Sequence, residues 1–130
     1  MAVDYTLGRH VDLDPAAARE AVIAALKTEG FGIISEIDMQ AAFDEKLGAE
    51  FRPYVILGAC KPQLAYDALQ LEPNLGALLP CNVVVQATDD GSHVAIVRPT
   101  ALFSVFENRD MAKIAVDVES AMERVLEKLG

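Results

Sequence analysis

The chain has 130 residues, of which 52% are hydrophobic and 24% charged, and its 20 acidic residues against 11 Lys and Arg give a net charge of −9. This length fits a single domain, and the apolar content excludes disorder over most of the chain. The negative charge opposes binding to phosphate backbones and anionic lipid surfaces, so we expect neither nucleic acid nor a membrane as a partner.

The first segments predict a strand followed by a helix. Residues 3–11 mix β-branched, aromatic and polar residues, as is typical of a strand. Asp14 followed by Pro15 predicts the start of a helix, because Asp accepts a backbone N–H at the N-cap and Pro fits the first turn. Gly30 is expected to end this helix in the left-handed conformation.

The middle of the chain predicts a second alternation of strands and helices. Residues 32–37 form the next expected strand, and Asp38 caps a short helix that ends by Gly48. The apolar run 53–59 has the length of a strand. The segment 61–71 then places apolar residues at helical spacing after a Pro at its first turn.

The last third predicts a hairpin and a long amphipathic helix. Strands at 82–87 and 93–98 flank a tight-turn sequence at 89–92, so we expect them to pair antiparallel. The final helix carries an apolar stripe that needs a covering layer. Its members are Ile114, Val118, Ala121, Val125 and Leu129. Together these elements predict an α+β fold with helices packed on one face of a mostly antiparallel sheet, in a single domain over 1–130.

The chain shows no sign of export or membrane insertion. Its N-terminus lacks the features of a signal peptide, and no apolar run approaches the length that crosses a bilayer. Two cysteines do not make a disulfide framework. We therefore expect a cytoplasmic protein with reduced thiols.

Cys60 stands where a predicted strand gives way to a predicted helix, in the sequence Leu-Gly-Ala-Cys-Lys-Pro. The first turn of a helix presents unpaired N–H groups that favour a thiolate over a thiol, and Lys61 acts in the same direction. The alternative is that Cys60 is a small buried packing residue, since free cysteines are often buried.

Cys81 follows 21 positions later, after Leu-Leu-Pro. If the intervening helix leaves the chain at the far end of the sheet, the two thiols are separated by a strand length. If the connection 72–80 carries the chain back, they share one pocket, and the spacing leaves both arrangements open. A zinc site would also need His10 and His93, which lie far from the cysteines in sequence.

No catalytic motif is present in the rest of the chain. There is no nucleophile elbow, dinucleotide fingerprint or phosphate-binding loop, and the acidic residues form no recognisable pair. Glu119, Glu123 and Glu127 recur every four residues on the last helix and predict a solvated face. These observations favour a protein that is not an enzyme.

The two cysteine-bearing blocks resemble the DUF302 family of small bacterial and archaeal proteins of uncharacterised function. The similarity runs over 54–86 and rests on Leu-Gly-Ala-Cys-Lys-Pro and Leu-Leu-Pro-Cys-Asn-Val. Family members often carry Asn after the first Cys, where this chain has Lys61, so the helix cap at that point is weakened. The resemblance implies a fold similar to the TATA-binding-protein-like class, assembled as a homodimer.

Our leading hypothesis is a homodimeric ligand-binding or sensing module. The candidate ligand-binding residues are Cys60, Lys61, Pro62, Pro80, Cys81 and Asn82. Cys60 is the expected reactive or metal-facing thiolate, Cys81 a second thiol ligand or resolving partner, and Asn82 a group that orients the ligand. A small molecule or a soft metal such as Cu(I), zinc or haem iron suits two thiols.

Two alternatives to this hypothesis remain. In the first, the protein is a thiol-dependent redox enzyme in which Cys60 attacks and Cys81 resolves. In the second, it is a structural dimer in which both cysteines serve only as packing residues.

Overall fold

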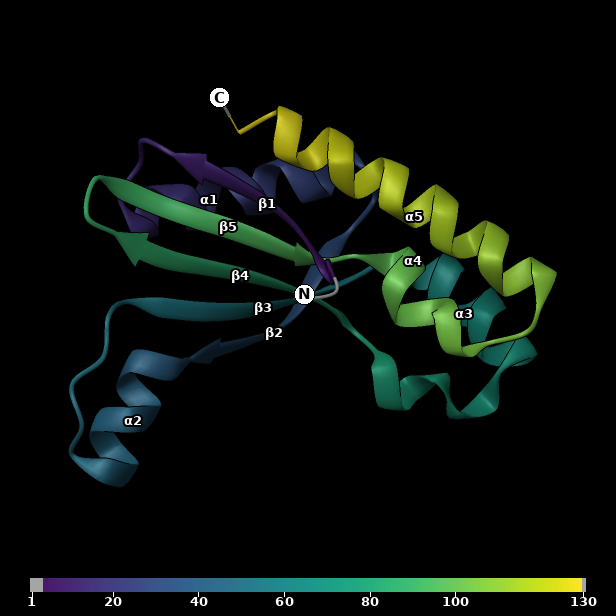
Figure 1. The fold of residues 1–130 in the computed structure, drawn as a ribbon, viewed down its shortest axis with the longest axis horizontal. Coiled ribbons are helices and arrows are strands. Elements are labelled where there is room, and N and C mark those ends of the chain that lie inside the picture. Colours follow the sequence, from purple (N-terminus) through teal and green to yellow (C-terminus); the bar gives the residue numbers. More distant parts are fainter. Residues whose placement is uncertain (1–3, 130) are drawn as a thin grey trace.

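A computed structural model describes residues 4–129 and shows a five-stranded antiparallel sheet in the order β1-β5-β4-β3-β2 (Figure 1). The strands are β1 Thr6–Val11, β2 Gly32–Asp38, β3 Tyr54–Cys60, β4 Cys81–Thr88 and β5 Gly91–Val97. The α-helices are α1 Pro15–Thr28, α2 Met39–Leu47, α3 Pro62–Leu71, α4 Pro99–Leu102 and α5 Arg109–Glu127. Two 3₁₀ helices, η1 Pro73–Leu78 and η2 Phe103–Val105, complete the chain.

The helix ends lie where the sequence places them. The Asp14 side chain accepts a hydrogen bond of 2.8 Å from the backbone N–H of Ala17, and Asp38 accepts one of 2.9 Å from Ala41. Gly30 follows α1 with φ of +85°, a conformation that L side chains rarely adopt. These local signals determine the helix boundaries without help from the rest of the fold.

The largest difference between a predicted and an observed element boundary is at the N-terminus. β1 begins at Thr6, whereas the composition of 3–11 predicts an earlier start. Its register explains the shorter strand, because Thr6 pairs with Val97, the last residue of β5. The part of that prediction on Val3 lies outside the described residues.

The core lies between the sheet and the helices α1 and α5. Alternate residues of the central strands are almost fully buried and face these helices, as period-two geometry requires. They are Leu57, Val83, Val85, Val94 and Ile96. The predicted stripe of α5 packs on the same core, so the α+β arrangement with helices on one face is confirmed. Within residues 4–129, no helix is both long and apolar enough to span a membrane.

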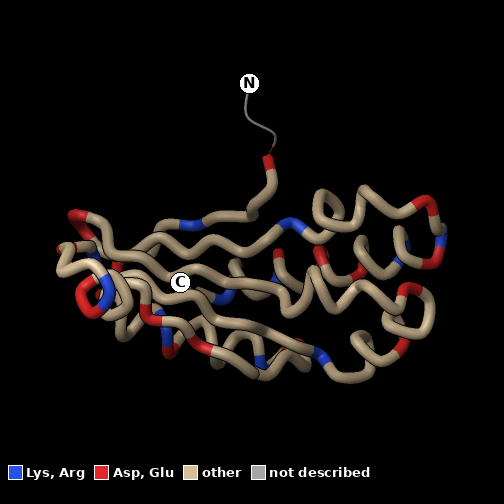
Figure 2. Tube along the Cα trace, turned by 90° about the horizontal axis from the view of Figure 1, so that it is seen from below, with Lys and Arg blue, Asp and Glu red and all other residues tan. Residues whose placement is uncertain are grey.

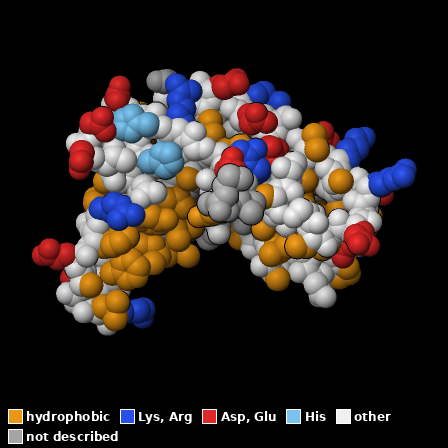
Figure 3. Space-filling model, viewed as in Figure 1, with side chains coloured by type: hydrophobic (Ala, Val, Ile, Leu, Met, Phe, Trp, Pro, Cys, Tyr) orange, Lys and Arg blue, Asp and Glu red, His pale blue; other side chains and the backbone are white. Residues whose placement is uncertain are grey.

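Within residues 4–129, no helix covers the central rows of the opposite face of the sheet. One row crosses all five strands as Gly8, Ala95, Val84, Ile56 and Ile37. A second row is His10, His93, Gln86 and Tyr54. We call this surface the open face. It merges with apolar side chains of α2, and Figure 3 shows the hydrophobic side chains gathered below the two histidines. Figure 2 shows few charged residues along the strands and many toward the ends of the molecule.

Glu119 corrects the expectation of a fully solvated acidic face on α5. Its side chain is only 15% exposed. It accepts hydrogen bonds from the backbone N–H and the hydroxyl of Thr100, at 3.1 and 2.7 Å, and one of 3.1 Å from Arg98. Glu119 therefore ties the start of α4 to α5, whereas Glu123 and Glu127 are exposed as expected.

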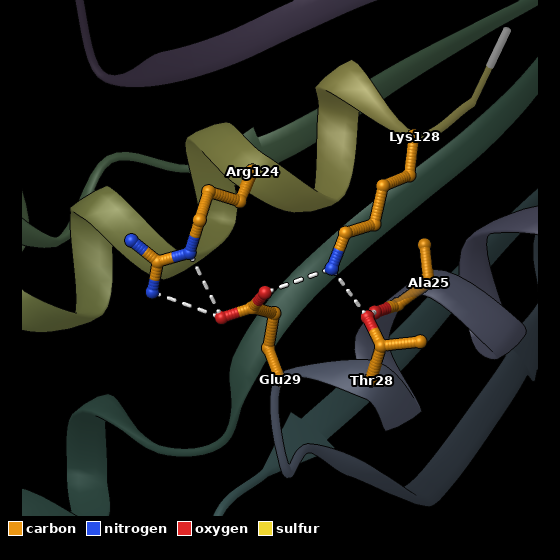
Figure 4. A network of polar contacts seen from close by, with 5 residues as sticks. All are labelled: Ala25, Thr28, Glu29, Arg124 and Lys128. Carbon is orange, nitrogen blue, oxygen red and sulfur yellow. Dashed lines mark hydrogen bonds and ion pairs between the residues drawn. The ribbon is translucent and has the colours of Figure 1, made fainter.

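A charged network joins the end of α1 to the end of α5 (Figure 4). Arg124 donates to Glu29 at 2.9 Å, and Lys128 donates to the other carboxylate oxygen at 2.8 Å. Lys128 also donates to the hydroxyl of Thr28 at 2.6 Å. The hydrogen bonds from Arg124 and Lys128 lower the pKa of Glu29 to about 2.

We expect Glu29→Gln to remove a pH-dependent part of the stability. Because the folded pKa of Glu29 is about 2 and the ordinary value is 4.5, the ionised carboxylate stabilises the fold above pH 4.5. This contribution is lost as the pH falls through about 2. The free energies of unfolding of wild type and variant, measured with urea, should converge as the pH falls from 4.5 to about 2. The exposed control Glu123→Gln should show no such convergence, and an identical trend in both variants would contradict the assignment.

Candidate functional site

A cavity of about 40 Å³ lies at one end of the sheet, where β3 and β4 meet α3 and α5. It sits between the main core and a smaller apolar cluster built around Leu75, Phe103 and Met111. The walls come from Phe31, Ala59, Cys60, Lys61, Leu64, Ala65, Ala68, Leu75, Leu79, Pro80, Cys81, Phe103, Ile114 and Val118. Apart from the two thiols and the Lys61 ammonium, the lining side chains are apolar.

The sequence brings Cys60 to this cavity as the last residue of β3. The helix α3 begins directly afterwards, with Lys61 as N-cap and Pro62 in the first turn. No side chain caps this helix, in agreement with the weakened cap expected from Lys at that position. The free N–H groups of the first turn therefore point toward the end of the strand that carries Cys60.

Cys81 reaches the same cavity because η1 carries the chain back to the end of the sheet from which α3 departed (Figure 1). β4 starts at Cys81, which pairs with Ala59, the neighbour of Cys60. Of the two topologies that the spacing allows, the structure has the one in which both thiols line one cavity.

The two thiols differ in burial and chemistry. Cys60 is half-buried, whereas Cys81 is 8% exposed. Burial, with a smaller effect from the neighbouring Cys60, raises the pKa of the Cys81 thiol to about 11. Cys81 is therefore protonated at neutral pH, and any metal that it binds must displace that proton.

Lys61 lies across the mouth of the cavity. Its ammonium is 6.0 Å from the centre of the Phe31 ring. A Cβ placed on Gly30 would lie 3.1 Å from the Cε of Lys61, so the aliphatic stem runs close over that glycine. This geometry puts a positive charge beside an apolar opening.

Two of the candidate residues are not among the cavity lining. Pro62 is exposed at the start of α3. Asn82 follows Cys81 in β4 and therefore points to the open face, where it lines a separate depression with Pro80 and Leu102. The structure thus groups Cys60, Lys61, Pro80 and Cys81, and the interpretation of Asn82 as part of the same site does not fit.

The histidines and cysteines occupy opposite ends of the sheet. His10 pairs with His93, and His93 pairs with Gln86 near the hairpin, whereas Cys81 begins the same strand at its other end. Within residues 4–129 no group of three or more His, Cys, Asp or Glu is arranged to hold a metal. A tetrahedral zinc site from the two histidines and two cysteines therefore does not fit this geometry.

Most of the cavity wall carried no functional signal in the sequence. Ile114 and Val118 belong to the predicted apolar stripe of the last helix, which indicates a core position and not a cavity. Phe31, Leu64 and Phe103 come from three separate segments. Only the packing of α3 and η1 against α5 reveals that these side chains enclose a space.

Comparisons with known proteins agree with the fold. A search of curated proteins finds no match. The crystal structure of an uncharacterised conserved DUF302 protein from Bacillus stearothermophilus is similar, with a TM-score of 0.91 and 27% sequence identity over 98% of this chain and 100% of that chain. The family described as "Domain of unknown function DUF302" matches residues 7–129. The chain therefore belongs to the DUF302 family.

Proposed function

We propose that the protein is a homodimeric binding or sensing module whose ligand occupies the cavity beside Cys60 and Cys81. The observation that carries this proposal is the convergence of both cysteines on one small, apolar-walled space. Buried apolar pockets with a few polar groups are the usual form of small-molecule sites. We also propose a cytoplasmic location, which suits a chain with two cysteines and no disulfide between them in the structure.

The cavity favours a small molecule over the metals that need several ligands. Two sulfurs alone can hold Cu(I), which accepts soft ligands in low number, whereas zinc requires four. The raised pKa of Cys81 makes thiolate coordination there depend on release of a proton. An apolar molecule needs no such step.

The test is the composition of protein purified without reductant or chelator. We expect one bound small molecule or one metal ion for each protomer, detected by native mass spectrometry and metal analysis. Cys60→Ala with Cys81→Ala should remove a thiol-held ligand, and Ala68→Leu should exclude any ligand by filling the cavity from α3. Wild-type protein that carries nothing, with two slow-reacting thiols, would make the cysteines packing residues.

A redox role is the second candidate, and it is supported by the presence of Cys60 and Cys81 in the wall of the same cavity. In this reaction the Cys60 thiolate attacks a disulfide substrate and releases one thiol, and Cys81 then attacks the mixed disulfide and releases the second. The substrate gains two electrons and the protein gains one disulfide. The buried, protonated Cys81 makes the second step slow at neutral pH. Oxidised glutathione should therefore leave an accumulated mixed disulfide, visible by intact mass.

The open face is the surface we propose for the homodimer. Its two rows hold no Lys, Arg, Asp or Glu in a chain with a net charge of −9. Arg52 lies at their edge, where its Nε donates to Gln86 at 3.0 Å. Two acidic copies that repel one another meet most favourably where neither presents negative charge.

The size of the open face agrees with a dimer only if α2 takes part. A third row of the open face consists of Thr6, Val97, Asn82, Gly58 and Ser35. Five strands and three rows span roughly 400 Å², given the spacing of strands and residues in a sheet, and a stable interface needs about 800 Å² from each partner. The exposed apolar side chains at the edge of the face extend this area: Ile37 is 49% and Leu47 is 73% exposed. Phe43 and Phe51 stack edge to face with ring centres 5.0 Å apart and continue the surface toward Tyr54.

A further inference from the structure

A polar groove adjoins the cavity. The groove has a volume of about 360 Å³ and shares Phe31, Lys61, Leu64 and Val118 with the cavity. Lys61 therefore belongs to the walls of both spaces, of which the cavity is apolar and the groove more polar.

The groove presents positive charge at the point where it meets the cavity. Among the described residues Lys61 has no ion-pair or hydrogen-bond partner within contact distance, although its ammonium stands at the shared wall. On the far wall Arg124 is paired with Glu29, whose other carboxylate oxygen is contacted by Lys128, so Lys61 is the groove cation that these ion pairs leave for a ligand (Figure 4).

Asp117 is the acidic residue of the groove that no cation pairs with among the described residues. Its side chain is exposed to solvent, which screens its charge. The groove lining thus holds two acids, Glu29 and Asp117, and two cations, Lys61 and Arg124, so a ligand head with one negative charge suits Lys61 better than a doubly charged phosphate. Ser120 adds a hydroxyl on the same wall.

The inner cavity limits the apolar part of the ligand. Its 40 Å³ holds about three water-sized groups, since one such group needs roughly 10–15 Å³. A space with this apolar lining attracts hydrocarbon more than water. The cavity therefore fits three or four carbon atoms, with a polar head beside Lys61.

We propose that this site binds a short-chain carboxylate, with its hydrocarbon end beside Cys60 and Cys81 and its carboxylate at the ammonium of Lys61. This inference rests on the proposed binding function and adds the chemical class of the ligand. Lys61 supplies the charge-assisted hydrogen bond, and Cys60 and Cys81 form part of the cavity wall.

The experiment is an NMR titration of methyl-labelled protein with four probes: pentanoate, acetate, 1-pentanol and pentylamine. Pentanoate should shift the methyl signals of Leu64 and Val118, and should bind at least tenfold more tightly than acetate, which lacks the tail. Pentylamine should bind more weakly than pentanol, because its cation faces Lys61.

Variants distinguish the contribution of the Lys61 charge to ligand affinity from the contribution of the apolar cavity. Lys61→Gln should weaken pentanoate about tenfold, the loss expected for one charge-assisted contact, and leave pentanol unchanged. Lys46→Gln on the distant α2 is the matched control and should change neither the affinity for pentanoate nor the affinity for pentanol. Ala68→Leu should abolish binding of both probes.

Two results would overturn the inference. If pentanol and pentanoate bind equally and Lys61→Gln has no effect, the carboxylate class is wrong while a binding cavity stands. If none of the probes shifts the Leu64 and Val118 methyls at millimolar concentration, the site does not take short amphipathic molecules. The proposed binding function is then judged separately, by the composition of the purified protein.

Discussion

Replacing Leu57 by Ala should remove about 2–5 kcal/mol from the free energy of unfolding. Leu57 is fully buried in β3 and faces α1 and α5, so truncation loses apolar burial and leaves a space that the core cannot close. This loss is a large share of the ~5–15 kcal/mol that stabilises a typical domain. Urea unfolding at low protein concentration measures it directly.

The neighbouring residue is the matched control. Ile56 stands on the same strand but faces the open side, and it is only partly buried. Ile56→Ala should cost about 1 kcal/mol or less under the same conditions, the range of strand substitutions outside a core. Equal losses for the two variants would contradict the assignment of the two faces.

Replacing Val84 by Glu should break the proposed homodimer. β4 is the middle strand of the sheet, and Val84 lies in the middle row of its open face. A two-fold contact through this face brings the two copies of residue 84 close together, so the variant buries two unpaired carboxylates. We expect the dimer dissociation constant to rise about 100-fold or more, as measured by sedimentation velocity.

The control for this variant carries the same change on another surface. Val116 is 54% exposed on α5, away from the open face. Val116→Glu should leave the dissociation constant unchanged. A Val84→Glu protein that remains dimeric, or a wild type that is monomeric at high concentration, would refute the open face as the dimer interface.

The local elements of this fold were predictable because their signals are local. Asp14 and Asp38 bind the first free N–H groups of α1 and α2, and each helix boundary follows from one side chain. The stripe of α5 depends only on helical periodicity. These interactions form within a few residues, so no knowledge of the tertiary fold is needed.

The site was less predictable because it depends on topology. Whether Cys60 and Cys81 meet is decided by the direction in which η1 returns the chain, and neither spacing nor composition encodes that direction. Asn82 lies outside the cavity lining because strand alternation turns it away from Cys81, and period two applied to β4 predicts this. Glu119 fits the period of an exposed helix face, but Arg98 and Thr100 reach it from a preceding segment.

Reaction with a small trivalent arsenical such as methylarsonous acid shows whether Cys60 and Cys81 open onto one site. Trivalent arsenic bonds to two thiols at once and releases water, and it does so intramolecularly only when both sulfurs are close together. If Cys60 and Cys81 open onto one accessible cavity, intact mass should show one arsenical for each protomer and no remaining free thiol. Cys60→Ala and Cys81→Ala alone should each lose this stable adduct. A wild-type protein that keeps two free thiols under saturating reagent, or binds two arsenicals, would contradict a shared cysteine site.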